Sequence, residues 1–144
     1  NDIFVDSLKI AGILIENQWA ANKLKSSIIG IGLNVNQTDF NTSFSPTSLS
    51  MLTKTEHSID DVLQLVIKYL KIYFEYLKQD RLSIIDKPYL DYLFRYNQWF
   101  NYKSSNSKFF SGKIIGVNND GLLIIEKKNG NRDSYDLKEI SFIL

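Results

Sequence analysis

The sequence predicts an α+β protein in which a region of strands and helices is followed by a small β-barrel. Three observations support this: apolar runs of strand length before residue 36, helical spacing of apolar residues between 58 and 94, and short apolar segments separated by turns after 98. The 144 residues, of which 44% are hydrophobic, suffice for a buried core. We expect one domain over residues 1–97 and a second over 98–144.

The first region begins with three predicted strands. Residues 3–5 form a short apolar run, and residues 9–16 (KIAGILIE) and 27–35 (SIIGIGLNV) are rich in β-branched side chains and too short for free-standing helices. The polar residues 17–26 between the two longer runs predict a hairpin connection, with Asn22 and Lys23 at its tip. These strands would form part of a mixed sheet.

A long loop and two helices are predicted next. Residues 36–48 (NQTDFNTSFSPTS) are polar, and loops of this length are often functional lids. Ser58 and Asp61 have the spacing of a helix cap, and apolar residues then recur at helical spacing to about Gln79. Asp86 is expected to cap a second helix with Pro88 in its first turn. Its predicted inward side chains are Tyr89, Leu90, Leu93 and Phe94.

The last region predicts five short antiparallel strands, which is typical of a small barrel. The expected strands are residues 99–102, 109–117, 122–127, 132–137 and 141–143. Turns rich in Asn and Gly separate several of them, at residues 118–121 and 128–130.

Composition excludes several classes of function. A formal net charge of +1 argues against nucleic-acid binding over the whole surface. The sequence has no cysteine, which excludes disulfides, thiolate metal sites and a cysteine nucleophile. Its one histidine, His57, lies in a polar stretch and is expected to be a solvated loop residue. No apolar run is long enough for a transmembrane helix, and residues 1–9 do not resemble a signal peptide.

The strand predicted at 27–35 has one apolar face and one nearly bare face. Gly30, Gly32 and Asn34 alternate with Ile29 and Ile31, so the glycines and the asparagine share a face. A bare face admits a flat ligand to the backbone, and Asn34 offers both donors and an acceptor. Close packing of a helix on the strand, or a barrel bend, would need the same glycines.

Lys9 stands at the edge of an apolar strand, near the bare position Gly12. Its ammonium either reaches water or meets an anion such as a phosphate or carboxylate. Strict alternation places Lys9 and Gly12 on opposite faces, so a shared site needs a bulge or an irregular strand entry. Asn1 and Asp2 could serve a base edge and Mg²⁺, or form a solvated chain end.

Together these segments resemble a family. The letters ND-x₆-KIAGILIE, then SIIGIGLNVNQ, then PTSL, are similar in order and spacing to the motifs K-W-P-N-D, K-[LIV]-[AGC]-G-I-L-[VI]-E, G-[LIVA]-G-[LIVA]-N-[VL]-N and A-T-S-L of the biotin protein ligases. Pro46 stands where the family often has alanine. The segment FSGKIIGVNNDGLLII resembles the C-terminal SH3-like domain of that family. The resemblance covers essentially the whole chain.

The resemblance implies part of a biotinyl-ligase-like catalytic domain, of the class II synthetase type, followed by the SH3-like barrel. The implied activity is ATP-dependent attachment of biotin to a lysine of a biotin carboxyl carrier domain through biotinyl-5'-adenylate, with Mg²⁺, in the cytoplasm. Lys9 is the implied catalytic cation. The implied biotin-binding residues are Lys9, Gly12, Leu14, Gly30 and Gly32; the implied nucleotide-binding residues are Asn1, Asn34, Asn36 and Thr47; Asp2 is a candidate metal ligand. The loop 36–47 would close over the adenylate.

The family's upstream G-R-G-R-x-G loop is not in this sequence, so we expect a fragment of a longer protein that is inactive alone. Such a half-sheet would expose apolar surface and favour self-association. Two alternatives stay open: a binding or assembly module without catalysis, and a related ligase acting on lipoate. Nothing in the sequence indicates nucleic-acid binding.

Overall fold

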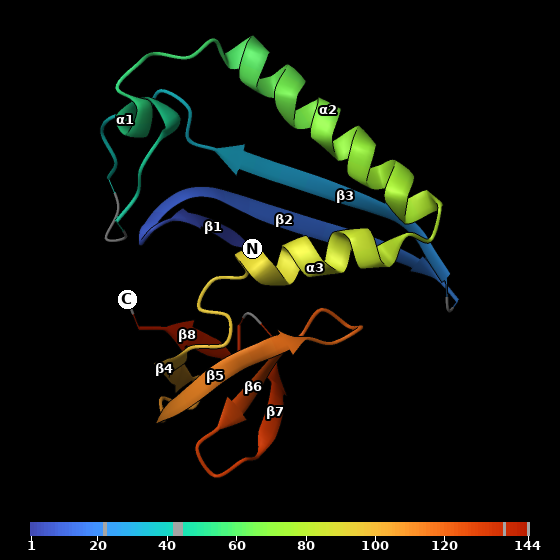
Figure 1. Cartoon of the computed structure of the whole chain (residues 1–144), viewed down its shortest axis with the longest axis vertical. Helices are drawn as coiled ribbons and strands as arrows, with labels where there is room; N and C mark the ends of the chain where they lie inside the picture. Colours follow the sequence, from blue (N-terminus) through green and yellow to red (C-terminus); the bar gives the residue numbers. More distant parts are fainter. Residues whose placement is uncertain (22, 42–44, 137, 144) are drawn as a thin grey trace. The chain divides into compact units, whose positions relative to one another are not determined.

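The computed structural model describes residues 1–21, 23–41, 45–136 and 138–143 (Figure 1). Within these ranges, three helices and two antiparallel sheets confirm the predicted α+β class. The chain divides into two compact units, Asn1–Lys71 and Ile72–Leu144. The two sheets share no strand. The domain boundary that the sequence predicts at residue 97 stays a prediction.

The sheet of the first unit has the order β1-β2-β3, with β1 at Asp2–Val5, β2 at Leu8–Ala20 and β3 at Lys23–Leu33. All three strands pair antiparallel. Figure 1 shows β2 and β3 as a long hairpin. The three predicted strands are therefore confirmed, although β3 ends at Leu33 rather than at residue 35.

The prediction that residues 17–26 form a connection is wrong, because the two strands continue almost to the tip. The polar side chains satisfy one another across the ladder: Ser27 Oγ donates to Asn17 Oδ1 at 2.7 Å, and Ser26 Oγ donates to Gln18 Oε1 at 3.0 Å. Cross-strand hydrogen bonds of this kind stabilise polar strands. Asn22, half of the predicted tip, lies outside the described residues.

Two helices follow the first sheet along the chain. The sequence analysis did not predict α1 (Leu49–Thr53), which begins where Ser48 Oγ accepts a hydrogen bond from the Met51 amide at 3.3 Å. Helix α2 (Ile59–Lys78) begins as predicted, because the Asp61 amide donates to Ser58 Oγ at 3.2 Å. The division between the two units falls within α2.

Helix α3 (Leu82–Tyr92) starts earlier than predicted, so the expected cap at Asp86 is wrong and Pro88 lies inside the helix. The reason is a tight connection: Asp80 adopts φ 55°, and the Arg81 amide donates to the Tyr76 carbonyl at 3.0 Å. The chain thus re-enters helix at once. Of the side chains predicted to face inward, Leu90, Leu93 and Phe94 are half-buried, whereas Tyr89 is exposed, which corrects that assignment.

The second unit holds the five predicted short strands in the order β7-β6-β5-β4-β8, all antiparallel. Their bounds are β4 Trp99–Ser104, β5 Phe109–Val117, β6 Leu123–Lys127, β7 Arg132–Tyr135 and β8 Ile140–Phe142. The strand predicted to reach residue 137 ends at Tyr135, and Leu137 itself lies outside the described residues. Gly121 and Gly130 make the turns with φ of 83° and 84°.

Burial differs between the two units. The barrel has a core of Tyr102, Ile114, Leu123, Ile125 and Ile140, against which half-buried aromatic rings pack. In the first unit, by contrast, the buried described residues are Ile10, Ala11, Thr47 and Ser48. Strands β2 and β3 expose many large apolar side chains, among them Leu14 at 64% and Ile28 at 60%. No helix in the described part of the chain is long and apolar enough to cross a membrane.

Candidate ligand-binding site

Three residues form a row across the first sheet. Asp2 of β1 lies opposite Gly12 of β2, which lies opposite Gly32 of β3, and Leu14 lies opposite Gly30 one step along. Residues directly opposite in an antiparallel ladder share a face, as do residues two apart on one strand. The sheet therefore brings Gly12, Leu14, Gly30 and Gly32 together on one face, as the sequence predicts, with Asp2 beside them.

A β-bulge brings Lys9 to this same face. Ile3 pairs with Ala11 and Phe4 pairs with Lys9, which leaves Ile10 as an extra residue in β2. An extra residue reverses the alternation locally and re-aims a side chain. A Cβ built on Gly12 would lie 3.9 Å from Lys9 Nζ, so the ammonium lies directly against the glycine row. Of the two arrangements that would let Lys9 and Gly12 share a site, the bulge is the one present.

The ammonium of Lys9 is held by a carboxylate. Lys9 Nζ lies 2.8 Å from Asp2 Oδ1, with side chains 34% and 36% exposed. The pair is thus open enough for an incoming anion to compete with Asp2 for the ammonium. The described residues contain no cluster of three or more His, Cys, Asp or Glu that could hold a metal, and Asp2, the predicted metal ligand, is engaged by Lys9 in this structure. The site residues therefore do not fit a metal by themselves.

The glycine row leaves the sheet open above the backbone. A Cβ built on Gly30 would meet only the Leu14 carbonyl, at 3.8 Å, and one on Gly32 only the Gly12 carbonyl, at 3.9 Å. No side chain of the described residues fills this space within 4 Å of either position. The arrangement is a flat apolar floor with one ammonium–carboxylate pair at its edge, which suits a ring system carrying a carboxylate.

A short extended segment runs beside Lys9. The Lys9 amide donates to the Ser45 carbonyl at 2.9 Å, and the Thr47 amide donates to the Lys9 carbonyl at 2.8 Å, which forms a parallel bridge at Pro46. Thr47 is only 1% exposed. In this structure Thr47, a predicted nucleotide contact, anchors the segment to the strand entry and keeps its side chain buried. Sequence spacing alone does not reveal this tie.

The side-chain amides of Asn34 and Asn36 form hydrogen bonds with the main chain of the protein. Asn34 Nδ2 donates to the Thr47 carbonyl at 3.0 Å. Asn36 Nδ2 donates to the His57 carbonyl at 2.7 Å, and its Oδ1 accepts from the His57 amide at 2.9 Å. Both asparagines thus fasten the polypeptide around α1, and the sequence analysis missed this role because the partners are 13 and 21 residues away. His57 is also not simply solvated, since its Nε2 lies 2.7 Å from Thr53 Oγ1.

Asn1 is placed differently. Its carbonyl accepts a hydrogen bond from the Ile13 amide at 2.7 Å, which extends the β1–β2 ladder by one residue, and the residue is exposed. Of the four predicted nucleotide contacts, Asn1 is exposed, and its register opposite Ile13 puts it on the other face of the ladder from Asp2 and Gly12.

The described structure thus belongs to the α+β class and joins an antiparallel sheet, with Lys9 beside a glycine row, to a five-stranded barrel of the SH3-like kind. No family model matches the chain. Among solved structures, apo biotin protein ligase from Aquifex aeolicus is similar with a TM-score of 0.75 and 21% identity, over 99% of this chain and 62% of that one. The same enzyme in complex with biotin and ATP gives 0.74 and 22%, over 99% and 59%. At this identity the likeness establishes the fold.

Curated relatives point to the same family. The bifunctional ligase/repressor BirA of Bacillus subtilis strain 168 is 29% identical over 141 residues, which cover 94% of this chain and 42% of the relative. BirA of Bacillus spizizenii matches to the same extent. In sequence the chain is thus similar to part of BirA, and in fold to part of a biotin protein ligase. The chain spans less than half the length of the curated relatives that it matches.

Proposed function

We propose that this chain supplies the C-terminal part of an active site that joins biotin to a lysine of a biotin carboxyl carrier domain through biotinyl-5'-adenylate. The observation that carries the proposal is the ammonium of Lys9 held against the Gly12–Gly32 row. The similarity to BirA and to a biotin protein ligase in complex with biotin and ATP supports it. In this proposal residues 1–97 belong to the catalytic domain, residues 98–144 form the SH3-like domain, and the reaction runs in the cytoplasm.

Lys9 would serve as the cation for adenylate formation. Attack of the biotin carboxylate on the α-phosphate of ATP brings two anions together, and a preorganised donor at the developing charge lowers that barrier. When substrate binds, the Lys9 ammonium would leave Asp2 and contact the substrate oxygens. This shift is short, because Asp2 and the bound substrate would both lie beside the glycine row. Gly12, Gly30 and Gly32 would admit the fused rings of biotin to the backbone, with Leu14 as an apolar side.

The nucleotide would be contacted from Asn1 and from the segment that Asn34, Asn36 and Thr47 hold in place. The last three act here by positioning, because their polar groups bond within the protein. The loop expected to close over the adenylate, residues 36–47, includes residues 42–44, which lie outside the described residues. A divalent ion would screen the triphosphate when bound. The described residues contain no cluster of His, Cys, Asp or Glu that could hold this ion, and Asp2 is paired with Lys9 before substrate binds.

Charge also bears on the activity of the chain alone. Lys9 is the only cation among the proposed site residues, and Asp2 compensates it. Two polyanionic substrates need more positive charge than one paired ammonium provides. We therefore propose that the chain alone does not catalyse the reaction.

The proposal is tested with a fusion in which this chain replaces the region of Bacillus subtilis BirA that it matches. We expect biotin-dependent exchange of labelled pyrophosphate into ATP and transfer of biotin to a carrier domain. Lys9→Ala should abolish most of the exchange, whereas Lys25→Ala, which removes an exposed lysine of β3, should leave it unchanged. Exchange driven by lipoate rather than biotin would show the alternative ligase. A folded fusion that binds the carrier but shows no exchange would favour an assembly module.

A further inference from the structure

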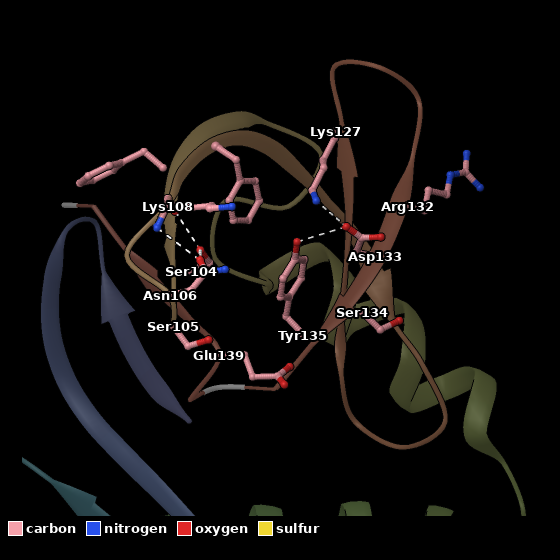
Figure 2. Close-up of a pocket in the computed structure, with 12 residues that line it drawn as sticks. Ser104, Ser105, Asn106, Lys108, Lys127, Arg132, Asp133, Ser134, Tyr135 and Glu139 are labelled. Atoms are coloured by element: carbon pink, nitrogen blue, oxygen red, sulfur yellow. Dashed lines mark hydrogen bonds and ion pairs between the residues drawn. The ribbon is translucent and has the colours of Figure 1, made fainter.

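The barrel carries a groove that the proposed reaction does not use. Its volume is about 720 Å³, and all of its lining residues belong to the second unit. One wall is β7, and the other is the turn between β4 and β5 (Figure 2). In Figure 2 the ring of Tyr135 lies between these walls, with Lys108 on one side and Asp133 on the other.

The floor of the groove is a pair of aromatic rings. Phe110 and Tyr135 stack with centroids 5.5 Å apart and an interplanar angle of 19°. Lys127 Nζ lies 5.2 Å above the centre of the Phe110 ring and forms an ion pair with Asp133, which also accepts a hydrogen bond from the Tyr135 hydroxyl. The polar groups of Lys127, Asp133 and Tyr135 are therefore engaged with one another, and the rings remain as a half-buried apolar platform.

The β7 wall is also an open sheet edge. Among the strands of the described residues, in the order β7-β6-β5-β4-β8, β7 has β6 as its one neighbour. The Lys127 amide donates to the Asn131 carbonyl at 2.8 Å, and Ile125 lies opposite Asp133. Because hydrogen-bonded and non-hydrogen-bonded pairs alternate in an antiparallel ladder, the main-chain groups of Arg132 and Ser134 face away from β6. An edge of this kind accepts an added extended strand.

The residues that line the groove carry one more positive than negative charge, with Lys108, Lys127 and Arg132 against Asp133 and Glu139. Lys127 is paired with Asp133, and Arg132 is paired with Glu126 at 3.1 Å. Glu139, on the opposite wall, accepts a hydrogen bond from the Asp136 amide at 2.9 Å. Lys108 lines the groove, and within the described ranges no carboxylate lies at ion-pair distance from it. A strand that enters the groove with a carboxylate would therefore complement Lys108.

We propose that this groove binds an extended peptide segment with an acidic side chain, which pairs with the main chain of β7. An aliphatic side chain of the peptide packs on the Phe110–Tyr135 platform, and the carboxylate meets Lys108. The proposal does not depend on the proposed ligase activity, because it involves only the barrel.

The test is a titration of the isotope-labelled 144-residue chain with two capped peptides, TVEVTVEV and TVKVTVKV, followed by amide chemical shifts. We expect the Glu peptide to shift the amides of Arg132, Ser134 and Lys108 and to bind at least about fivefold more tightly than the Lys peptide. Lys108→Gln should weaken the Glu peptide about three- to fivefold at low salt, whereas the matched change Lys128→Gln, in the neighbouring turn, should not. Ser134→Pro should weaken it about tenfold, because it removes an edge donor at a position where proline is tolerated.

Equal affinity for the two peptides, or unchanged binding by a folded Ser134→Pro variant, would overturn the proposal. If that variant does not fold, the Glu peptide with alternate backbone amides N-methylated replaces it, and undiminished binding of that peptide would be equally decisive against strand pairing. Shifts of the β7 amides that grow with protein concentration and block the peptide would show that a second copy of the chain occupies the edge, which also overturns it.

Discussion

Lys9 Nζ lies 2.8 Å from Asp2 Oδ1 across the β1–β2 pair, and both groups stand beside Gly12. This relationship exists only because Ile10 is an extra residue in β2. Without the bulge Lys9 would point to the opposite face, away from the glycine row. The ion pair therefore keeps the ammonium at the edge of the floor until an anion displaces Asp2.

Removing the ammonium of this pair should lower the activity of the fusion far more than its stability. In the BirA fusion, Lys9→Ala should lower pyrophosphate exchange by roughly two to three orders of magnitude, which is the usual effect of losing one preorganised donor. The free energy of unfolding should change by less than about 1 kcal/mol, because the pair is one-third exposed. Urea titration and the exchange assay measure the two effects. Wild-type exchange in Lys9→Ala would remove Lys9 from the site.

Filling the glycine row should block biotin while leaving the sheet intact. Gly32→Val places a branched side chain over the floor, and a Cβ at this position meets only the Gly12 carbonyl at 3.9 Å. Valine also suits a strand. Calorimetry on the fusion should show biotin binding lost in Gly32→Val and retained in Ser26→Val, which alters the same strand further along. Undiminished affinity in folded Gly32→Val would mean that the glycines serve packing.

Substitution by alanine should destabilise the barrel at one glycine of β5 and have almost no effect at another. A Cβ on Gly112 would overlap Ile125 Cγ2, and the Ile125 side chain is fully buried, so it cannot yield cheaply. A Cβ on Gly116 would meet nothing within 4 Å. Gly112→Ala should therefore cost about 1–3 kcal/mol of barrel stability, as overpacking usually does, and Gly116→Ala should be nearly neutral. Equal unfolding midpoints in urea for the two variants would contradict this account of the core.

The barrel should lose stability in acid. Hydrogen bonds from Lys113 and Arg132 lower the pKa of Glu126, and the hydrogen bond from Lys127 lowers the pKa of Asp133. A carboxyl whose pKa is lower in the folded state stabilises it above its unfolded pKa of about 4, and this contribution is lost as the pH falls through the folded pKa. Chemical denaturation at stepped pH should show the fall, and Glu126→Gln should flatten it. The exposed turn variant Asp120→Asn serves as the control and should reproduce the wild-type curve.

The 144-residue chain alone should be inactive and should self-associate. Strands β2 and β3 expose large apolar side chains such as Leu14, Ile15 and Ile28 in the described structure, and surfaces of this kind favour association. Biotin transfer to a carrier domain should be undetectable, and light scattering should give a mass above that of the monomer. Robust transfer by the chain would contradict the charge argument, and a monomer would contradict the association.

Local chemistry made much of the fold readable from the sequence. Alternating β-branched residues predicted β2 and β3, the Ser58 cap predicted the start of α2, and the turns closed by Gly121 and Gly130 predicted the barrel hairpins. Each of these signals acts within a few residues, where steric preference and capping hydrogen bonds decide the outcome. Polar strand ends were misjudged for the same reason, because the partners that satisfy Asn17 and Gln18 are eight to ten residues away.

The candidate site shows the same division. The resemblance to the motifs of the biotin protein ligases implied that Lys9, Gly12, Gly30 and Gly32 belong together. Only the tertiary structure decided that Lys9 faces the glycines, because the bulge at Ile10 is a property of pairing with β1 and leaves no mark on the periodicity of β2. The engagement of Asn34 with the Thr47 carbonyl and the open edge of β7 were decided in the same way, since long-range pairing determines which polar groups remain free for a ligand.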